Sequence, residues 1–215
     1  MIEQLFAVPM ATFGLEKPEP LISDLRALFL AAEQRGDEYR NEIRRDTQHG
    51  ELFESRFDLF RWQEPPVQAL AKFCHTALAS VISEVNEYEA EELGALKFDY
   101  HAWFHVTRKG GYQGLHNHAN ASWSGIFCVD PGDEVPERPD SGVVRFHDPR
   151  GNASYYMDAG NSRLTPAFCH GSYQIRHQAG RLLIFPSYLY HEIFPYMGER
   201  PRIVVAFNCW INPAS

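Results

Sequence analysis

The sequence has few cysteines and a shortage of basic residues, and each shortage excludes a class of protein. Its cysteines lie far apart and form no C-x-x-C pair: Cys74, Cys128, Cys169 and Cys209. We therefore expect reduced, mostly buried thiols instead of a disulfide framework or a cysteine-ligated zinc site. Lysine and arginine total 20 against 28 acidic residues, giving a net charge of −8. Because this charge repels phosphate backbones and anionic lipid, we expect no nucleic-acid or membrane partner.

Long apolar runs are also missing. No run approaches the roughly 20 residues that cross a bilayer. Residues 1–6 lack the basic region followed by an apolar region that opens a signal peptide, so we expect a cytoplasmic protein. The composition, 44% hydrophobic and 22% charged, is typical of a globular chain, and 215 residues suffice for one substantial core. The sequence predicts a single domain over residues 1–215.

Helical periodicity is confined to the N-terminal part of the chain. The spacing of apolar residues predicts a helix over residues 20–34, ending near Gly36. It predicts a longer helix over residues 65–85, opened by a Pro-Pro pair that suits a first turn. Residues 37–63 are polar and ambiguous. We expect residues 1–95 to form a mostly helical segment that supports the remainder of the chain.

From residue 97 onward the period changes to two, which is typical of strands. In residues 98–106 the side chains Phe98, Tyr100, Ala102, Phe104 and Val106 alternate with Asp99, His101, Trp103 and His105. Further strand candidates, separated by turn-forming residues, are 122–129, 142–147, 172–177, 181–185, 192–196 and 202–211. Short strands without intervening helices predict an antiparallel barrel or jelly roll over residues 96–215, with the helices packed outside.

Two histidines one residue apart follow a glycine-rich stretch, in the segment 110–118 that reads GGYQGLHNH. Residues i and i+2 of a strand project to the same side, so His116 and His118 can present both imidazoles to one point. Two neutral nitrogen donors about 2 Å from a common centre are what a metal ion requires. The alternative interpretation is a pair of surface histidines beside a glycine turn.

A third histidine and an arginine follow near the C-terminus. His191 comes after an apolar strand and a Pro-Ser turn, and Arg202 opens a strand eleven residues later. The period of two places Arg202, Val204, Ala206 and Asn208 on one face. If that face is the barrel interior, Arg202 is a buried cation that requires an anion, and a carboxylate ligand is the natural candidate. The alternative is that Arg202 lies at the strand entrance and faces water.

The order of these residues resembles the Fe(II)/2-oxoglutarate-dependent oxygenases, whose fold is a double-stranded β-helix. That pattern is H-x-[D/H], a distal histidine some seventy residues later, and an arginine about ten residues beyond it. The sequence is similar, over nearly its whole length, to an uncharacterised bacterial and phage group within these oxygenases. The matching segments are 5–9, 110–118, 124–129, 141–150, 185–191, 198–202 and 207–208.

The resemblance implies that His116 and His191 ligate iron and that Arg202 anchors the distal carboxylate of the co-substrate 2-oxoglutarate. The sequence departs from the family at His118, where the usual triad of two histidines and one carboxylate has its carboxylate. We favour a metal site of His116, His118 and His191 over a site in which water replaces His118. A three-imidazole site carries one negative charge less, which weakens Fe(II) binding and raises its redox potential.

Other polar residues have several interpretations. Tyr112 and Asn208 are candidates for hydrogen bonds to the co-substrate or to a ligand histidine, and Tyr112 is equally a candidate for packing on the barrel rim. His101 and His105, which share a face with Trp103, are candidates for the pocket wall. We interpret the remaining histidines of the C-terminal half as surface or packing residues: His147, His170 and His177.

These observations predict an Fe(II)- and 2-oxoglutarate-dependent dioxygenase of the hydroxylase type. Such an enzyme converts 2-oxoglutarate to succinate and CO2 while it hydroxylates an unactivated C–H bond. One alternative is a cupin-type three-histidine mononuclear metal dioxygenase that does not use 2-oxoglutarate, in which Arg202 has no role. Another is a non-catalytic metal-binding β-sandwich. We expect a small-molecule or peptide substrate.

Overall fold

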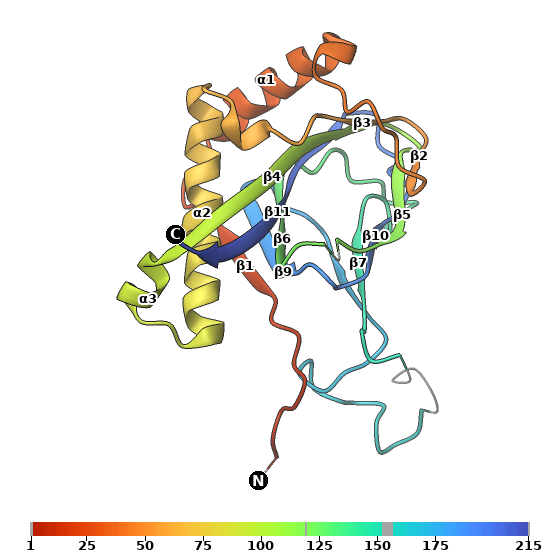
Figure 1. Ribbon diagram of the computed structural model, residues 1–215. Coiled ribbons are helices and arrows are strands. Elements are labelled where there is room, and N and C mark those ends of the chain that lie inside the picture. The colour runs from red at the N-terminus through yellow and green to blue at the C-terminus, as the bar shows by residue number, and fades with distance from the viewer. Residues whose placement is uncertain (1, 119, 152–156, 215) are drawn as a thin grey trace.

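The computed structural model describes residues 2–118, 120–151 and 157–214, which form two facing antiparallel sheets with helices outside the larger one (Figure 1). The elements in chain order are β1 (Ala11–Gly14), α1 (Leu21–Gln34), the 3-10 helix η1 (Gly36–Glu38), β2 (Gln48–His49), β3 (Leu52–Glu54), the 3-10 helix η2 (Leu59–Arg61), α2 (Pro65–Asn86), α3 (Ala90–Gly94), β4 (Leu96–Thr107), β5 (Tyr112–His116), β6 (Trp123–Asp130), β7 (Val144–His147), β8 (Ser172–Ile175), β9 (Arg181–Pro186), β10 (His191–Ile193) and β11 (Arg202–Pro213).

The two sheets have different sizes and strand orders. The larger sheet has the order β1-β9-β6-β11-β4-β3, and the smaller has the order β2-β5-β10-β7-β8. Strands β4 and β11 pair along their whole length, from Arg202 opposite Thr107 to Pro213 opposite Leu96. The antiparallel jelly-roll architecture predicted from the sequence is therefore confirmed.

Helices α1 and α2 cover the outer face of the six-stranded sheet, as predicted (Figure 1). Helix α1 buries a stripe that includes Leu25 and Phe29, whose ring stacks on Phe104 of β4 at 4.4 Å between ring centres. Helix α2 buries a matching stripe that includes Leu70 and Leu78. Both helices have bounds close to those predicted, because each buries one apolar stripe with a period near 3.6.

A second, smaller core fills the space between the sheets. Strands β6, β9 and β11 are covered on both faces, so their residues alternate between the outer and the inner core. In β11, for example, Val205 packs toward the helices while Val204 packs toward the five-stranded sheet. The inner core consists of Ile126, Val144, Phe146, Leu183, Phe185, Leu189, Ile193 and Val204.

The N-terminal part, residues 1–95, contributes three short strands to the sheets in addition to its helices. Strands β1 and β3 extend the six-stranded sheet at its two edges, and β2 extends the five-stranded sheet. These strands span two to four residues each, too short for alternation to show in the sequence. The short helix α3 was also not predicted.

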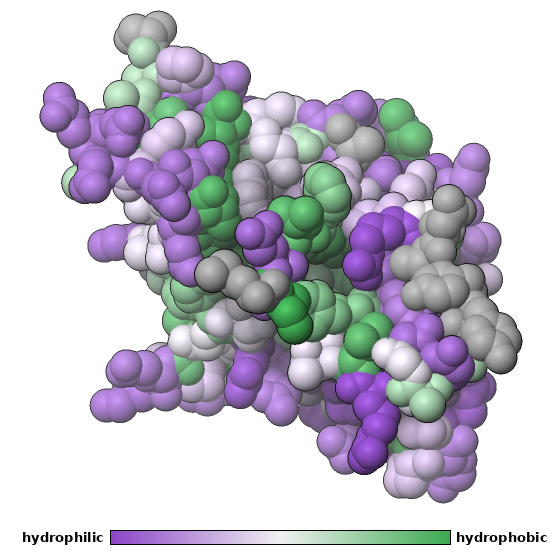
Figure 2. Space-filling model, turned by 90° about the horizontal axis from the view of Figure 1, so that it is seen from below, coloured by the Kyte–Doolittle hydropathy of each residue, from purple (hydrophilic) through white to green (hydrophobic). Residues whose placement is uncertain are grey.

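The end of the molecule that lies lowest in Figure 1 is seen face-on in Figure 2, where hydrophobic side chains gather toward the middle of the face. The N-terminus lies at this end (Figure 1). Residues Ile2, Leu5 and Phe6 are exposed, whereas Val8 and Met10 pack against the inner core. Residues 8 and 10 therefore help to close the space between the sheets.

The cysteines agree with the expectation of reduced, mostly buried thiols. Cys74, Cys128 and Cys209 are buried and Cys169 is exposed, and all four are free. Burial raises the pKa of the Cys128 and Cys209 thiols to about 12, so they are uncharged and poor nucleophiles near neutral pH. Among the described residues, the helices are all too short or too polar to traverse a bilayer.

Candidate metal centre

Three histidines meet at the inner face of the five-stranded sheet. His116 ends β5 and His191 begins β10, and the two are direct cross-strand partners. His118 follows two residues after His116, with its backbone N–H donating to the carbonyl of Ser187 at 2.8 Å. The ring centres lie 4.4 to 5.3 Å apart, and one nitrogen from each ring lies within 4.8 Å of the others. Cross-strand pairing thus joins two segments that are far apart in sequence.

Each of these rings donates its Nδ1–H to an oxygen, which leaves Nε2 free. A carbonyl oxygen only accepts, so Nδ1 of His116 and of His191 must carry the proton, and the Asn208 side-chain oxygen sets the same tautomer for His118. Each ring then has an unprotonated Nε2 with which it can bind a metal ion. The contacts are His116 Nδ1 to the Gly114 carbonyl (2.7 Å), His191 Nδ1 to the Leu189 carbonyl (3.1 Å) and His118 Nδ1 to Asn208 Oδ1 (2.5 Å).

Burial keeps all three imidazoles neutral. It lowers the pKa of His118 to about 4, and it lowers the pKa values of His116 and His191, the latter well below its usual range. A metal ion binds the neutral ring, so protons do not compete for these nitrogens at neutral pH. The cluster suits a divalent metal that accepts imidazole ligands, and Fe(II) is one such ion.

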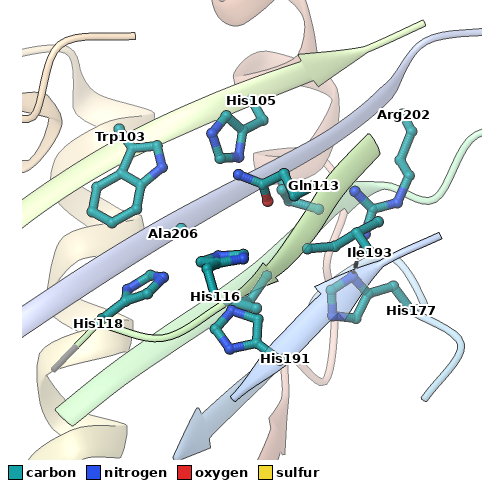
Figure 3. Close-up of a pocket in the computed structure, with 12 residues that line it drawn as sticks. Trp103, His105, Gln113, His116, His118, His177, His191, Ile193, Arg202 and Ala206 are labelled. Atoms are coloured by element: carbon teal, nitrogen blue, oxygen red, sulfur yellow. Dashed lines mark hydrogen bonds between the residues drawn. The ribbon is translucent and has the colours of Figure 1, made fainter. Parts of the chain in front are cut away.

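A cavity extends from the three histidines to Arg202 (Figure 3). Arg202 opens β11 on the opposite sheet and is 3% exposed. Its Nη2 donates to Nδ1 of His177 at 2.9 Å. Within the described part of the chain, no carboxylate forms an ion pair with it. A buried guanidinium without an acidic partner is costly, so the cavity is suited to bind an anion at this end.

Strand β4 of the six-stranded sheet and strand β5 of the five-stranded sheet carry further side chains with polar groups. Trp103, His105 and Gln113 line the cavity (Figure 3), and the indole N–H of Trp103 is buried without a partner in the described structure. His105 bonds through Nε2 to Glu54 at 2.9 Å. Gln48 and Asn41 each donate to the same carboxylate at 2.7 Å. Burial raises the pKa of Glu54, but His105 and Asn41 outweigh it and the net shift is downward, so Glu54 is ionised.

The donor set fits the groups that the sequence resemblance implies. The three imidazoles suit Fe(II), and Arg202, which has no acidic partner among the described residues, suits a carboxylate. A family model described as "Putative 2OG-Fe(II) oxygenase" matches residues 101–208, half of the chain. The chain belongs to this family. It is a 2-oxoglutarate/Fe(II)-dependent oxygenase, an oxidoreductase that uses Fe(II) and 2-oxoglutarate. The comparison with curated proteins gave no match.

Solved structures of similar fold include two prolyl hydroxylases. A prolyl-4-hydroxylase from Pseudomonas putida is 18% identical with a TM-score of 0.60, and the match covers 94% of this chain and 91% of that one. A prolyl hydroxylase from Trichoplax adhaerens, in complex with a hypoxia inducible factor peptide fragment, is 14% identical with a TM-score of 0.60 and coverage of 94% and 83%. HygX from Streptomyces hygroscopicus, with nickel, 2-oxoglutarate and hygromycin B bound, is 12% identical with a TM-score of 0.57 and coverage of 98% and 86%. The fold is accordingly the double-stranded β-helix.

Tyr112, for which the sequence left both a co-substrate contact and packing on the rim open, does not line the cavity. The pairing of β5 with β10 shifts between His116 and Gln113, so a bulge lies between these two residues. Because the bulge changes the alternation, Gln113 shares the cavity face with His116, and Tyr112 lies on the other face. There its ring stacks on His49 at 4.6 Å between centres. Gly114 within the strand was the available signal for this bulge.

Of the other candidate residues, some line the cavity or contact a histidine of the cluster, and one lies at the surface. Asn208 hydrogen-bonds the His118 ring, which is one of the two roles considered for it. His105 lines the cavity, whereas His101 is exposed and packs on Trp210. His177, which was interpreted as a surface or packing residue, lines the cavity and contacts the guanidinium of the buried arginine.

Proposed function

We propose that His116, His118 and His191 hold Fe(II) in this oxygenase, and that Arg202 anchors the distal carboxylate of 2-oxoglutarate. The enzyme would then hydroxylate a C–H bond of a small molecule or peptide. The observation that carries the proposal is the presence, in one cavity, of three free Nε2 atoms and a buried guanidinium without an acidic partner in the described structure. The net charge of −8 disfavours a polyanionic substrate.

The side chains of the cavity have distinct tasks in this proposal. His116 and His191 belong to the five-stranded sheet and, with His118, would hold the metal ion, whereas Arg202 lies on the facing sheet. Arg202 binds and orients the dicarboxylate where water is scarce, which strengthens a charge-assisted contact. Ile193, lying between the two ends of the cavity, helps to exclude water (Figure 3). When bound, Fe(II) and 2-oxoglutarate would supply the oxidative chemistry with O2 as the oxidant, and one oxygen atom of O2 would enter succinate and the other the hydroxylated product, with release of CO2.

The neutral triad changes the electrostatics of the site. An aspartate or glutamate at position 118 would add a negative charge beside the metal, and His118 adds none. The proposed site therefore binds a divalent cation less tightly than a site with two histidines and a carboxylate, and it stabilises Fe(III) less. The short contact of His118 with Asn208 fixes the ring orientation and limits the loss of affinity.

A 2-oxoglutarate turnover assay tests the proposal. The protein is incubated with Fe(II), ascorbate and 2-oxoglutarate, and succinate is measured with and without candidate substrates. We expect slow succinate release by the wild type, loss of release in His191→Ala, and an increase of about 100-fold in KM for 2-oxoglutarate in Arg202→Ala. Arg200→Ala is the matched control, because Arg200 is exposed and pairs with Asp133 outside the cavity.

Two outcomes would contradict the proposal. If the wild type neither binds 2-oxoglutarate nor releases succinate, and Arg202→Ala changes nothing, Arg202 does not anchor 2-oxoglutarate. If the protein consumes oxygen without 2-oxoglutarate in a manner that depends on the three histidines, the cupin-type alternative is favoured.

A further inference from the structure

We infer that His177 is the second half of the carboxylate site, and that its Nε2–H donates a hydrogen bond to the distal carboxylate that Arg202 anchors. The inference rests on the proposed role of Arg202. His177 would then be a co-substrate-binding residue, which nothing in its sequence context indicates.

The contact between the two side chains fixes the tautomer of His177. Arg202 Nη2 lies 2.9 Å from His177 Nδ1, and a guanidinium has donors but no acceptor. The Nδ1 atom must therefore accept, which requires that it carry no proton. In a neutral ring the proton is then on Nε2, so the second nitrogen is a donor. The guanidinium beside it and the burial both oppose protonation of Nδ1, and they lower the pKa of His177 to about 3.

This donor has no partner in the described structure. His177 is 5% exposed, and its Nε2 is buried without a hydrogen-bond partner. Most buried polar groups in folded proteins are hydrogen-bonded, and an exception indicates a missing ligand or a functional role. The bound ligand would have to supply an acceptor at this point.

The position of His177 identifies the class of acceptor. In Figure 3, His177 and Arg202 lie together at one end of the cavity, away from His118. One of the guanidinium N–H groups is used by His177, and its remaining N–H groups are available to a ligand. A carboxylate has two acceptor oxygens and the negative charge that the buried guanidinium lacks. It can accept from both Arg202 and His177 while it neutralises the guanidinium, which an uncharged ligand does not do.

Two substitutions separate this binding role from a structural one. His177→Asn keeps a side-chain oxygen near the position of Nδ1, where it can accept from Arg202, but it has no donor at the position of Nε2. His177→Gln places an amide N–H near the position of Nε2. His147→Asn is the matched control, because His147 lies outside the cavity and contacts Glu192 at 3.1 Å.

The assay is calorimetric titration of Mn(II)-loaded protein under nitrogen with two acids, 2-oxoglutarate and 2-oxopentanoate. The second acid has the same carbon chain but no distal carboxylate, so it reports binding at the metal end alone. We expect His177→Asn to weaken 2-oxoglutarate binding by about tenfold or more and to leave 2-oxopentanoate binding unchanged. We expect His177→Gln to bind 2-oxoglutarate with an affinity within about threefold of that of the wild type. His147→Asn should bind it with the affinity of the wild type.

The outcomes distinguish the inference from the proposed function. Equal 2-oxoglutarate affinity of His177→Asn and wild type overturns the inference, and so does an equal loss for both acids, which indicates a structural role. In either case a loss of 2-oxoglutarate affinity in Arg202→Ala leaves the proposed function standing. If the wild type binds the two acids equally and Arg202→Ala changes neither, the proposed anion site itself is wrong.

Discussion

Replacing Asn208 by alanine should weaken metal binding, although Asn208 does not face the metal directly. Its Oδ1 accepts from Nδ1 of His118 at 2.5 Å and from the hydroxyl of Ser124 at 2.9 Å. Without the amide, the His118 ring can rotate and exchange tautomers. A metal ion must then restrict both motions when it binds, and this lowers its affinity.

The expected magnitude follows from the effect of such orienting partners. Their loss lowers metal affinity by about 10- to 100-fold, or about 1.4 to 2.7 kcal/mol. A metal at 100 times its Kd stabilises the folded protein by about 2.7 kcal/mol, and a tenfold weaker site leaves about 1.4 kcal/mol. For a chain of this size, about 1 kcal/mol corresponds to about 2–4 °C in Tm. The metal-induced rise in Tm should therefore fall by half or more in Asn208→Ala.

Thermal unfolding with and without Mn(II) or Fe(II), supported by competition with a chelating dye, measures this effect. For each variant, the Tm without metal is subtracted from the Tm with metal. This difference is not affected by a change in the stability of the apoprotein. Asn208→Asp keeps a hydrogen-bond acceptor for His118 and should retain or increase the affinity for the metal. His118→Ala should lose more metal affinity than Asn208→Ala does.

Two results would refute this reasoning. If Asn208→Ala binds metal as the wild type does while His118→Ala does not, the orientation of His118 does not depend on Asn208. If His118→Ala also binds as the wild type does, His118 is not a ligand and the site has two histidines.

Three further predictions concern stability, measured by urea unfolding of the apoprotein. Burial lowers the pKa of His177 to about 3, so below pH 6.5 the unfolded chain binds a proton that the folded chain does not. Stability falls as the pH drops through this window, and His177→Gln should reduce the loss between pH 7 and pH 5 by about 2 kcal/mol. A Cβ at Gly125 would lie 2.3 Å from the Phe207 ring, so Gly125→Ala should lower the free energy of unfolding by about 2 kcal/mol. Gly94→Ala is the control and should not lower it, because the space around Gly94 is open. Glu54→Gln cannot accept all the hydrogen bonds of this buried carboxylate and should cost about 3 kcal/mol at pH 7. An unchanged loss of stability between pH 7 and pH 5 in His177→Gln would contradict the first expectation. Urea midpoints equal to that of the wild type in Gly125→Ala or in Glu54→Gln would contradict the other two.

The parts of the fold that could be predicted depend on local periodicity. Helix α2 and strands β4 and β11 are long enough for one face to differ clearly from the other, so their bounds and buried faces are readable. Arg202 was assigned to the cavity face for the same reason. Strand β2 was missed, because two residues show no alternation.

The missing parts of the site depend on pairing between distant segments. His177 follows β8 and meets Arg202 only because the two sheets face each other, and no local pattern indicates that meeting. A bulge separates Tyr112 from His116, so simple alternation along β5 does not give the face on which the Tyr112 ring lies. The three-histidine cluster is easier to predict, because a single residue separates His116 from His118 in the sequence.

The division of the site between the two sheets has a consequence for selectivity among co-substrates. His116 and His191 belong to the five-stranded sheet, and Arg202 belongs to the six-stranded sheet. If the ligand binds as proposed, the span between its oxo-acid end and its distal carboxylate would be set by the separation of the sheets, which the side-chain volumes of the inner core maintain. Enlarging Val204 would alter the preference between 2-oxo diacids that differ by one methylene, although the side chain bears no polar group.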